Sequence, residues 1–179
     1  GVDAVGAVAA ALHAEGVQAE VRLAGSGSAE LIEQIAREAP RAADGTPQVR
    51  FLGTLGGREL RQEMLAADVF LFPTRYNEGF PRVLYEAMTL GTPIVAPRSD
   101  LFDWILHDGA NALLCEAEID AYVDATRAIL TDATLASRLS AGGRETMKRF
   151  FDALPARSHA AQVASRFEDE ALTQSRVAA

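Results

Sequence analysis

The sequence predicts a doubly wound α/β fold, with a mostly parallel sheet of about five strands flanked by helices. Short apolar runs alternate with longer segments of helical periodicity, and glycines or prolines separate most of them. The run Asp68–Phe72 is apolar and aromatic after its first residue and stops at Pro73, as expected of a strand buried on both faces. Because parallel neighbours need crossover helices, this alternation favours a parallel sheet.

Composition limits the class of protein. The chain has 179 residues, 49% hydrophobic and 23% charged, which suits one domain over residues 1–179, with a helical tail over 151–179. Acidic residues outnumber basic ones 25 to 17, and the net charge of −8 argues against nucleic acid as a partner. No apolar run approaches the ~20 residues that a bilayer span needs. We expect no transmembrane segment, and a cytoplasmic protein that at most contacts the inner face of the membrane peripherally.

Metal chemistry is not expected. Cys115 is the only cysteine, so no internal disulfide can form. His13, His107 and His159 are far apart and have no acidic neighbours at metal-ligand spacing. The sequence therefore predicts no metal site and no other cofactor.

The first part of the chain is predicted to contain three helices and two strands. Gly16 is placed to end the first helix, and Ser28 is placed to cap the second. A polar stretch over 40–47 reads as a surface connection. The expected helices cover residues 2–14, a segment that begins at 29, and 58–66; the expected strands cover 19–24 and 48–53.

The second part repeats the alternation. The strand over 68–72 is expected in the middle of the sheet, and the helix after it carries Pro81 in its first turn and ends at Gly91. Tyr85 and Met88 are expected on its core face, and Trp104 is expected in the core. The expected strands cover residues 68–72, 94–96 and 112–115; the expected helices cover 80–90, 100–107, 119–130, 133–150 and 156–172.

Ligands of such sheets bind beyond the carboxyl ends of the strands, so we expect the functional residues in the loops there. The turn Gly25–Ser28 resembles the start of a dinucleotide-binding fingerprint, but Glu30 stands where the third glycine would be. An NAD-dependent dehydrogenase is therefore disfavoured. The turn is either a simple strand-to-helix connection or a loop that touches part of a nucleotide.

Two acids flank the start of the helix that follows the strand 68–72. Glu78 precedes this helix and Glu86 lies inside it, eight positions later, a spacing of about 12 Å if all eight residues were helical. Between them lies the helix N-terminus, whose free N–H groups and positive dipole end suit a phosphate. Gly79 would let the backbone approach a ligand closely.

This arrangement suits a ligand with hydroxyl groups at both ends and phosphate in the middle, which describes a nucleotide sugar. One carboxylate can accept two hydrogen bonds from a ribose diol, and the other can accept from sugar hydroxyls. A glycosidase needs its two carboxylates about 5–10 Å apart across one bond. The spacing here does not guarantee that distance, so hydrolysis is less favoured.

These residues also carry a resemblance to a known family. Glu78–Pro81, Glu86–Met88 and Gly91–Ala96 together resemble the acid-x7-acid signature of retaining GT-B glycosyltransferases of family 4. The resemblance covers nearly the whole chain and implies one half of a GT-B fold, a Rossmann-like domain that binds the sugar donor. The other segments that are similar, in order, to this C-terminal domain are Val21–Ser28, Val49–Gly53, Ala67–Val69 and Asp108–Leu114.

The resemblance implies roles for individual residues. Glu78 and Glu86 would be catalytic, with Glu86 accepting hydrogen bonds from the donor ribose and Glu78 beside the transferred sugar. The leaving diphosphate is thought to take the acceptor's proton in this family, so no protein nucleophile is implied. The implied donor-binding residues are Gly25, Ser26, Gly27, Gly53, Thr54, Glu78, Gly79, Phe80, Pro81, Arg82, Val83 and Glu86.

The implied reaction transfers a hexose from a nucleoside-diphosphate sugar to a hydroxyl of a glycan, a lipid or a small molecule. The family's Arg and Lys for the diphosphate come from a segment before the first helix here, so we expect a fragment. We expect its partner to be a missing N-terminal acceptor domain, and the fragment alone to be inactive. Ser99–Asp103 departs from the family's glycine-rich stretch. The alternative is a non-catalytic Rossmann-like module that binds a nucleotide or a protein.

Overall fold

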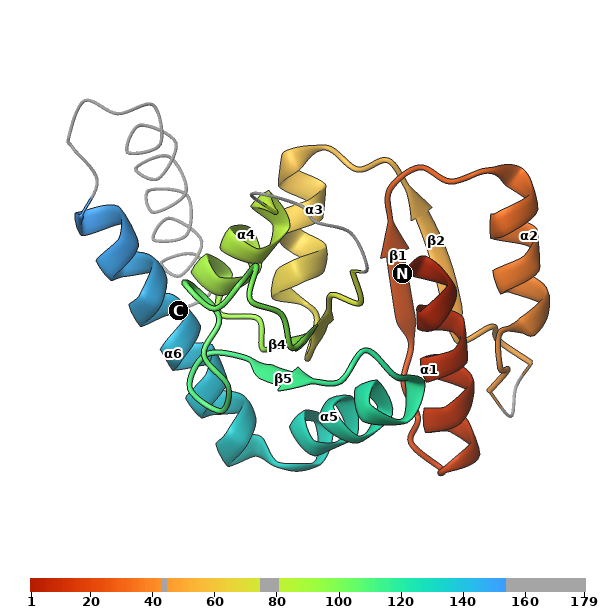
Figure 1. Ribbon diagram of the computed structural model, residues 1–179. Helices are drawn as coiled ribbons and strands as arrows, with labels where there is room; N and C mark the ends of the chain where they lie inside the picture. The colour runs from red at the N-terminus through yellow and green to blue at the C-terminus, as the bar shows by residue number, and fades with distance from the viewer. Residues whose placement is uncertain (43–44, 75–80, 154–179) are drawn as a thin grey trace, which may run out of the picture.

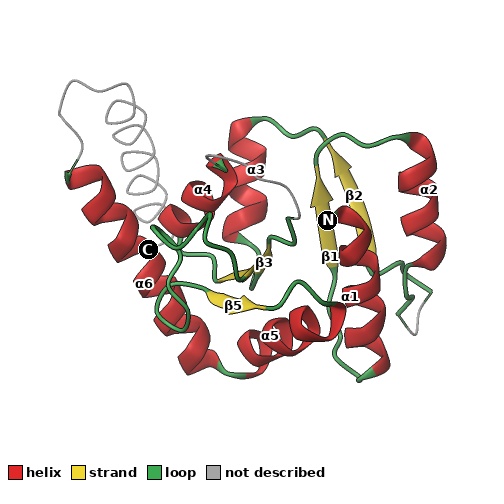
Figure 2. Ribbon diagram, viewed as in Figure 1, coloured by secondary structure: helices red, strands yellow, loops and turns green. Residues whose placement is uncertain are grey.

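The computed structural model describes residues 1–42, 45–74 and 81–153, in which helices and strands alternate from the N-terminus to the fourth strand (Figure 1). The strands lie at the centre, with helices around them (Figure 2). The helices are α1 (Val2–Ala14), α2 (Ala29–Glu38), α3 (Gly57–Leu65), α4 (Arg82–Leu90), α5 (Ile119–Thr131) and α6 (Ala133–Asp152). The strands are β1 (Val21–Ala24), β2 (Val49–Gly53), β3 (Phe70–Leu71), β4 (Ile94–Pro97) and β5 (Leu113–Cys115).

The five strands are parallel, as predicted, but they form two sheets. One sheet has the order β1-β2 and the other the order β3-β4-β5. Val21 pairs with Val49 in the first sheet, and Val95 pairs with Leu113 in the second. The α/β class with a parallel arrangement is confirmed, while the single sheet is replaced by a two-stranded and a three-stranded part.

Three apolar clusters hold these layers together. The first cluster, which we call the α4 core, lies on one face of β4, and the second, the α5 core, lies on its other face. The third, the α2 core, lies against β1 and β2. Helix α1 joins the two sheets, because Val8 and Leu12 belong to the α5 core whereas Ala9 belongs to the α2 core. The α4 core includes Leu84, Met88, Ile94, Ala96 and Met147; the α5 core includes Val8, Leu12, Val95, Val123 and Leu139; the α2 core is Ala9, Ile35, Ala39 and Val49.

The strand predicted over 68–72 in the middle of the sheet differs from the observed strand in length and in position. It shortens to β3, Phe70–Leu71, and it stands at the edge of its sheet, while β4 is central and fully buried. Both faces are packed but only partly buried, since the half-buried Phe70 contacts the α4 core and the half-buried Leu71 contacts the α5 core. The continuous apolar run therefore reflects packing against two layers of helices and not a central position in the sheet.

Several helix ends agree with the sequence. Ser28 caps α2 by accepting a hydrogen bond from the Leu31 N–H at 3.2 Å. Gly16, with φ of 81°, follows α1 in the left-handed region. Gly91, with φ of 77°, ends α4 as predicted. Helix α4 begins at Arg82, with Pro81 at the N-cap position and not in the first turn.

The predicted helix over 100–107 is wrong. These residues form successive turns, in which the Phe102 N–H donates to the Ser99 carbonyl at 3.1 Å and the Ile105 N–H to the Phe102 carbonyl at 2.9 Å. Trp104 is 49% exposed, so its predicted core position is also wrong. Phe102 and Ile105 are buried instead, because the turns carry these two residues inward.

Two predictions fall outside the part of the chain that the structure describes. They are the helix over 156–172 and the loop over 75–80, which includes Glu78, Gly79 and Phe80. Among the described residues, no helix is both long and apolar enough to cross a membrane.

Candidate functional site

The two glycine turns of the sequence prediction meet at the carboxyl ends of β1 and β2. The Gly25 N–H donates to the Gly53 carbonyl at 2.8 Å, and both glycines have positive φ, 138° and 69°. A Cβ on either would meet no atom within 4 Å, so the space above them is open. The predicted ligand residues Ser26, Gly27 and Thr54 lie beside this junction and are exposed. This end of the sheet therefore offers backbone groups and small side chains to a ligand.

Glu30 stays charged and exposed at the start of α2. The pKa of its carboxyl is lowered, first by its own backbone N–H and then by the Ser28 hydroxyl. A carboxylate at this helix N-terminus occupies the place where a dinucleotide's pyrophosphate would lie. The local structure thus supports the prediction against a dinucleotide fingerprint.

The start of α4 presents backbone donors. Pro81 is buried at the N-cap and has no N–H, and its carbonyl accepts from the Leu84 N–H at 3.0 Å. The N–H groups of Arg82 and Val83 are the first of this helix, where four N–H groups have no intrahelical acceptor. Anions are favoured at such a position by these donors and by the helix dipole.

Glu86 lies one turn into α4 and is mostly buried, with 16% of its side chain exposed. Burial raises the pKa of its carboxyl, while the charges of Arg82 on the same helix and Arg61 on α3 act in the opposite direction. The Arg82 guanidinium, itself 80% exposed, lies 3.8 Å from the carboxylate. An oxygen acceptor is therefore held between two helices, with cationic side chains on both.

The partner of Glu86 in the predicted pair cannot be placed. Glu78, Gly79 and Phe80 lie outside the described residues, so the separation of the two acids stays a prediction. The estimate of about 12 Å assumed helix throughout. Since α4 begins at Arg82, only the four steps to Glu86 are helical.

Helix α1 begins near the carboxyl end of β3. A Cβ on Gly1 would collide with the carbonyl of Pro73, so the first residue of the chain touches the end of the segment that follows β3. Helices α2, α3 and α4 each follow a strand, so their N-termini lie at carboxyl strand ends, and Gly1 at the start of α1 lies against Pro73 after β3. Such convergence is the usual geometry of ligand sites in open parallel sheets.

The loop between β4 and β5 is held by side-chain amides and an ion pair. The buried Asn111 accepts from the His107 N–H at 2.7 Å and donates to the Ile105 carbonyl at 2.9 Å. The Arg98 guanidinium lies 2.8 Å from the Asp108 carboxylate. These contacts fix a loop without a helix, and Trp104 projects from it 6.1 Å from the ring of Tyr85. The loop that departs from the family pattern is nonetheless ordered by its own residues.

Other reactive groups do not form a centre. Within the described parts of the chain no group of three or more His, Cys, Asp or Glu could hold a metal ion. Burial raises the pKa of the Cys115 thiol to about 11, so this residue is a thiol and not a nucleophilic thiolate at neutral pH. Among the described residues, the candidate site offers a carboxylate, backbone donors and arginines.

Sequence reasoning missed Arg61. The predicted helix over 58–66 contained this residue, but nothing in the sequence indicated that α3 packs against α4. Its charge partly opposes the burial that raises the pKa of the Glu86 carboxyl, which makes Arg61 a candidate cation for the site. A contact between helices separated by a strand has no local periodicity, so it became visible only in the fold.

Comparisons with known proteins agree with this geometry. The family described as glycosyl transferases group 1 matches residues 1–132. A phosphatidyl-myo-inositol mannosyltransferase of Mycobacterium leprae is 38% identical over 103 residues, which cover 57% of this chain and 28% of that protein. The chain thus spans under a third of the length of this relative.

Solved structures share the fold. Sucrose-phosphate synthase of Thermosynechococcus elongatus has a TM-score of 0.70 and 24% identity, over 92% of this chain and 41% of that one. HepE of Anabaena, in complex with UDP and glucose, has a TM-score of 0.62 and 22% identity, over 73% of this chain and 36% of that one. These likenesses support the Rossmann-like half of a GT-B fold, and with the match over residues 1–132 they show that the chain belongs to the group 1 glycosyl transferases.

Proposed function

We propose that this chain is the donor-binding half of a retaining glycosyltransferase of family 4, which transfers a hexose from a nucleoside diphosphate. One observation carries the proposal. The mostly buried Glu86 carboxylate lies one turn from the N-terminus of α4, at the rim where the parallel strands end. A ribose diol and a diphosphate need this combination of a fixed acceptor and backbone donors.

The remaining contacts can be assigned along the same ligand. The diphosphate would lie against the N–H groups of Arg82 and Val83, and the ribose hydroxyls would donate to Glu86. The glycine junction of Gly25 and Gly53, with its open space, would flank the base of the nucleotide. Glu78 would lie beside the transferred sugar.

The catalytic step needs no protein nucleophile in this proposal. The acceptor hydroxyl forms the new bond to the anomeric carbon on the face that the diphosphate leaves, and the leaving diphosphate takes the proton. Backbone donors and arginines near α4 would stabilise the charge that develops on the leaving group. The sugar and the acceptor, a glycan, a lipid or a small molecule, are left to experiment.

The names of relatives support a nucleotide-sugar donor. A mannosyltransferase is similar in sequence, and a protein holding UDP and glucose is similar in fold. The whole protein would require an acceptor-binding domain as partner, because hexose transfer joins two substrates. The use of one cysteine, Cys115, fits a reducing cytoplasm, with peripheral contact to the inner membrane face as a further expectation.

A thermal-shift panel of nucleoside diphosphates and their sugars tests the proposal. A ligand that binds only the folded chain raises its stability by about 2.7 kcal/mol at a hundredfold excess over Kd. One nucleoside class should raise the melting temperature, and Glu86→Gln should weaken that binding about tenfold to hundredfold, since a hydrogen bond to a charged group contributes about 1.5–3 kcal/mol.

Glu15→Gln is the matched control. Glu15 follows the last turn of α1, at the opposite end from the candidate site, and it pairs with Arg127 at 3.4 Å. The control should leave the ligand-induced shift unchanged. Silence across the whole panel, in buffers where the chain is folded, would favour the non-catalytic module over the transferase.

A further inference from the structure

Strands β1 and β3 are edge strands of two neighbouring sheets. The sheets have the orders β1-β2 and β3-β4-β5, and within the described residues no strand pairing joins them. In Figure 2, β3 lies on the β1 side of the two-stranded sheet, away from β2. Ala19, just before β1, and Leu71 of β3 pack against the same apolar cluster, the α5 core. The free edges of β1 and β3 therefore border the same region of the molecule.

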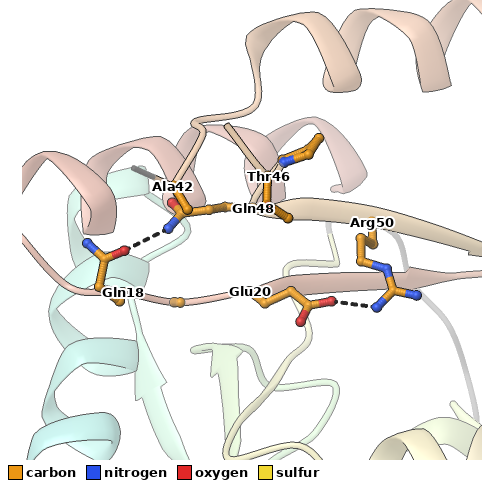
Figure 3. Close-up of a pocket in the computed structure, with 8 residues that line it drawn as sticks. Gln18, Glu20, Ala42, Thr46, Gln48 and Arg50 are labelled. Atoms are coloured by element: carbon orange, nitrogen blue, oxygen red, sulfur yellow. Dashed lines mark hydrogen bonds and ion pairs between the residues drawn. The ribbon is translucent and has the colours of Figure 1, made fainter. Parts of the chain in front are cut away.

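Strand β1 is bonded to β2 along its other edge. At the amino end of this sheet the Val21 N–H donates to the Gln48 carbonyl at 2.7 Å. The Gln48 side chain adds a second link, because its Nε2 donates to the Gln18 Oε1 at 3.2 Å (Figure 3). Successive residues of a strand turn their backbone groups to opposite edges. The N–H and C=O of Arg22, which follows Val21, therefore point away from β2.

Strand β3 has the same arrangement on its side. The Phe70 N–H donates to the Pro93 carbonyl at 2.7 Å, and the Phe72 N–H donates to the Val95 carbonyl at 2.8 Å. Both bonds run toward β4, so the N–H and C=O of Leu71 point away from β4. A row of such groups at a sheet edge is a template for a further strand.

Helix α1 indicates how far apart the two edges are. Its residues Val8 and Leu12 belong to the α5 core, whereas Ala9 belongs to the α2 core against β1 and β2. An α-helix with its side chains is about 10 Å across, and neighbouring strands are about 4.8 Å apart, so one helix covers two strand spacings. Because α1 packs on both sheets, β1 and β3 are separated by about the width of one strand.

The path of α1 sets the direction of a strand at this place. Gly1 lies against the Pro73 carbonyl, so α1 begins at the carboxyl end of β3, and it ends at Ala14, before β1. Helices α2, α3 and α4 likewise begin after the carboxyl end of one strand and lead to the next. A strand that led into α1 in the same way would end beside Pro73 and run parallel to its neighbours.

We propose that the edges at Arg22 and Leu71 take an extended peptide segment that runs parallel to β1 and β3 and continues into α1 at Gly1. This segment would join the two sheets into one, because it would pair with β1 on one side and with β3 on the other. Its side chains toward α1 would be apolar, since Val8 and its neighbours lie there. Main-chain hydrogen bonds supply the affinity in strand addition. The proposal does not rest on the proposed donor-binding function.

Hydrogen exchange of the ¹⁵N-labelled chain tests whether the edges are open. The Arg22 and Leu71 amides should exchange about tenfold or more faster than their matched neighbours Val21 and Phe72, whose N–H groups donate within the sheets. Equal protection of all four amides would show that both edges are already bonded, and it would overturn the proposal.

An extension ahead of Gly1 tests the occupant. The probe is a strand of about six alternating Val and Thr residues, joined to Gly1 by a linker of about four Gly and Ser residues. It should slow exchange of the Arg22 and Leu71 amides about tenfold or more and raise the urea midpoint of unfolding. The matched control has prolines at the centre of the same strand, which cannot donate to a ladder. It should leave both amides as they are in the unextended chain.

Three results with the extension would overturn the proposal. They are unchanged exchange of both amides, equal protection by the proline control, and protection that increases with protein concentration, which indicates pairing between copies. Should the extended chain precipitate, the comparison of Arg22 and Leu71 with Val21 and Phe72 in the unextended chain decides alone.

Discussion

The three-stranded and the two-stranded parts of this molecule differ in how completely their strands are buried. Strand β4 is buried on both faces, with Ile94 in the α4 core and Val95 in the α5 core. Strands β1 and β2 bury one face only, against the α2 core, whereas Arg22 and Arg50 remain on exposed positions. Parallel sheets are ordinarily covered on both sides. We therefore expect the chain's stability to be concentrated in the half that carries Glu86.

The same difference makes the α4 side of the candidate site the well-packed side and the glycine junction the open side. The α4 side of the candidate site stands on a packed core, so its acceptor and backbone donors keep their places. The glycine junction on β1 and β2 has open space above it and a thin core beneath it. A site between these halves can fix the reacting end of a ligand and let the other end adapt.

Of the substitutions considered, Leu84→Ala should lower the free energy of unfolding most. Leu84 is fully buried in the α4 core, and truncation there costs about 2–5 kcal/mol through lost transfer energy and a cavity. We expect the upper part of this range from urea unfolding. Ile35→Ala in the α2 core should cost about 2 kcal/mol, since a small cluster at a thin layer can collapse around the gap. Equal costs would contradict the difference between the halves.

Gly91→Ala should destabilise the fold more than Gly53→Ala. Both glycines have left-handed φ, 77° and 69°, for which a Cβ costs about 1–2 kcal/mol. At Gly91 the Cβ would also run into the Arg144 guanidinium, while at Gly53 it would meet nothing within 4 Å. Thermal unfolding of both variants measures the packing contribution as their difference. A larger loss at Gly53 would show that the two-stranded part is the tighter one.

Glu86→Gln should stabilise the free chain at neutral pH. Burial raises the folded-state pKa of this carboxyl above its ordinary value of 4.5, so stability is lost as the pH rises from 4.5 toward the raised value, and the full cost of the ionised form is present above it. The advantage of the variant should appear as the pH rises through 4.5 and should vanish below it. Urea unfolding from pH 4 to pH 8 checks the sign, with Glu15→Gln as control. A variant less stable at every pH would show that the ionised carboxylate is a structural anchor.

Arg22→Ala should have the smallest effect. Its guanidinium lies 2.8 Å from the Glu63 carboxylate on α3, and the two side chains are 36% and 35% exposed. Exposed pairs contribute about 0–1 kcal/mol and weaken with salt. Unfolding at low and high salt should give a small difference that disappears at high salt. A loss above 1 kcal/mol would mean that the open face of β1 and β2 is better protected than its exposure indicates.

Most elements could be predicted from local signals. Ser28 caps α2, and Gly16 and Gly91 stand in left-handed conformations, because cap chemistry and positive φ restrict the residue types. The prediction of a helix over 100–107 was wrong because the side chains of Asn111 and Arg98 organise that loop through hydrogen bonds to the carbonyls of Ile105 and Leu114. A pattern of apolar residues cannot report such bonds.

The candidate site was predictable in part. The glycine turns and the start of α4 were located from strand ends, and the structure brings Gly25 to Gly53 directly. The contribution of Arg61 and the edge position of β3 depend on which elements become neighbours. The pairing of Glu78 with Glu86 remains a prediction, because Glu78 lies outside the described residues.

The most direct test of the central claim is an NMR titration of the ¹⁵N-labelled chain with UDP and GDP, in the wild type and in Glu86→Gln. The account predicts that one nucleotide shifts the amides of Arg82, Val83 and Gly25, and that Glu86→Gln weakens its binding about tenfold or more. Nucleotide binding of unchanged strength in a folded Glu86→Gln chain, or shifts confined to the rim of Gln48, would contradict it.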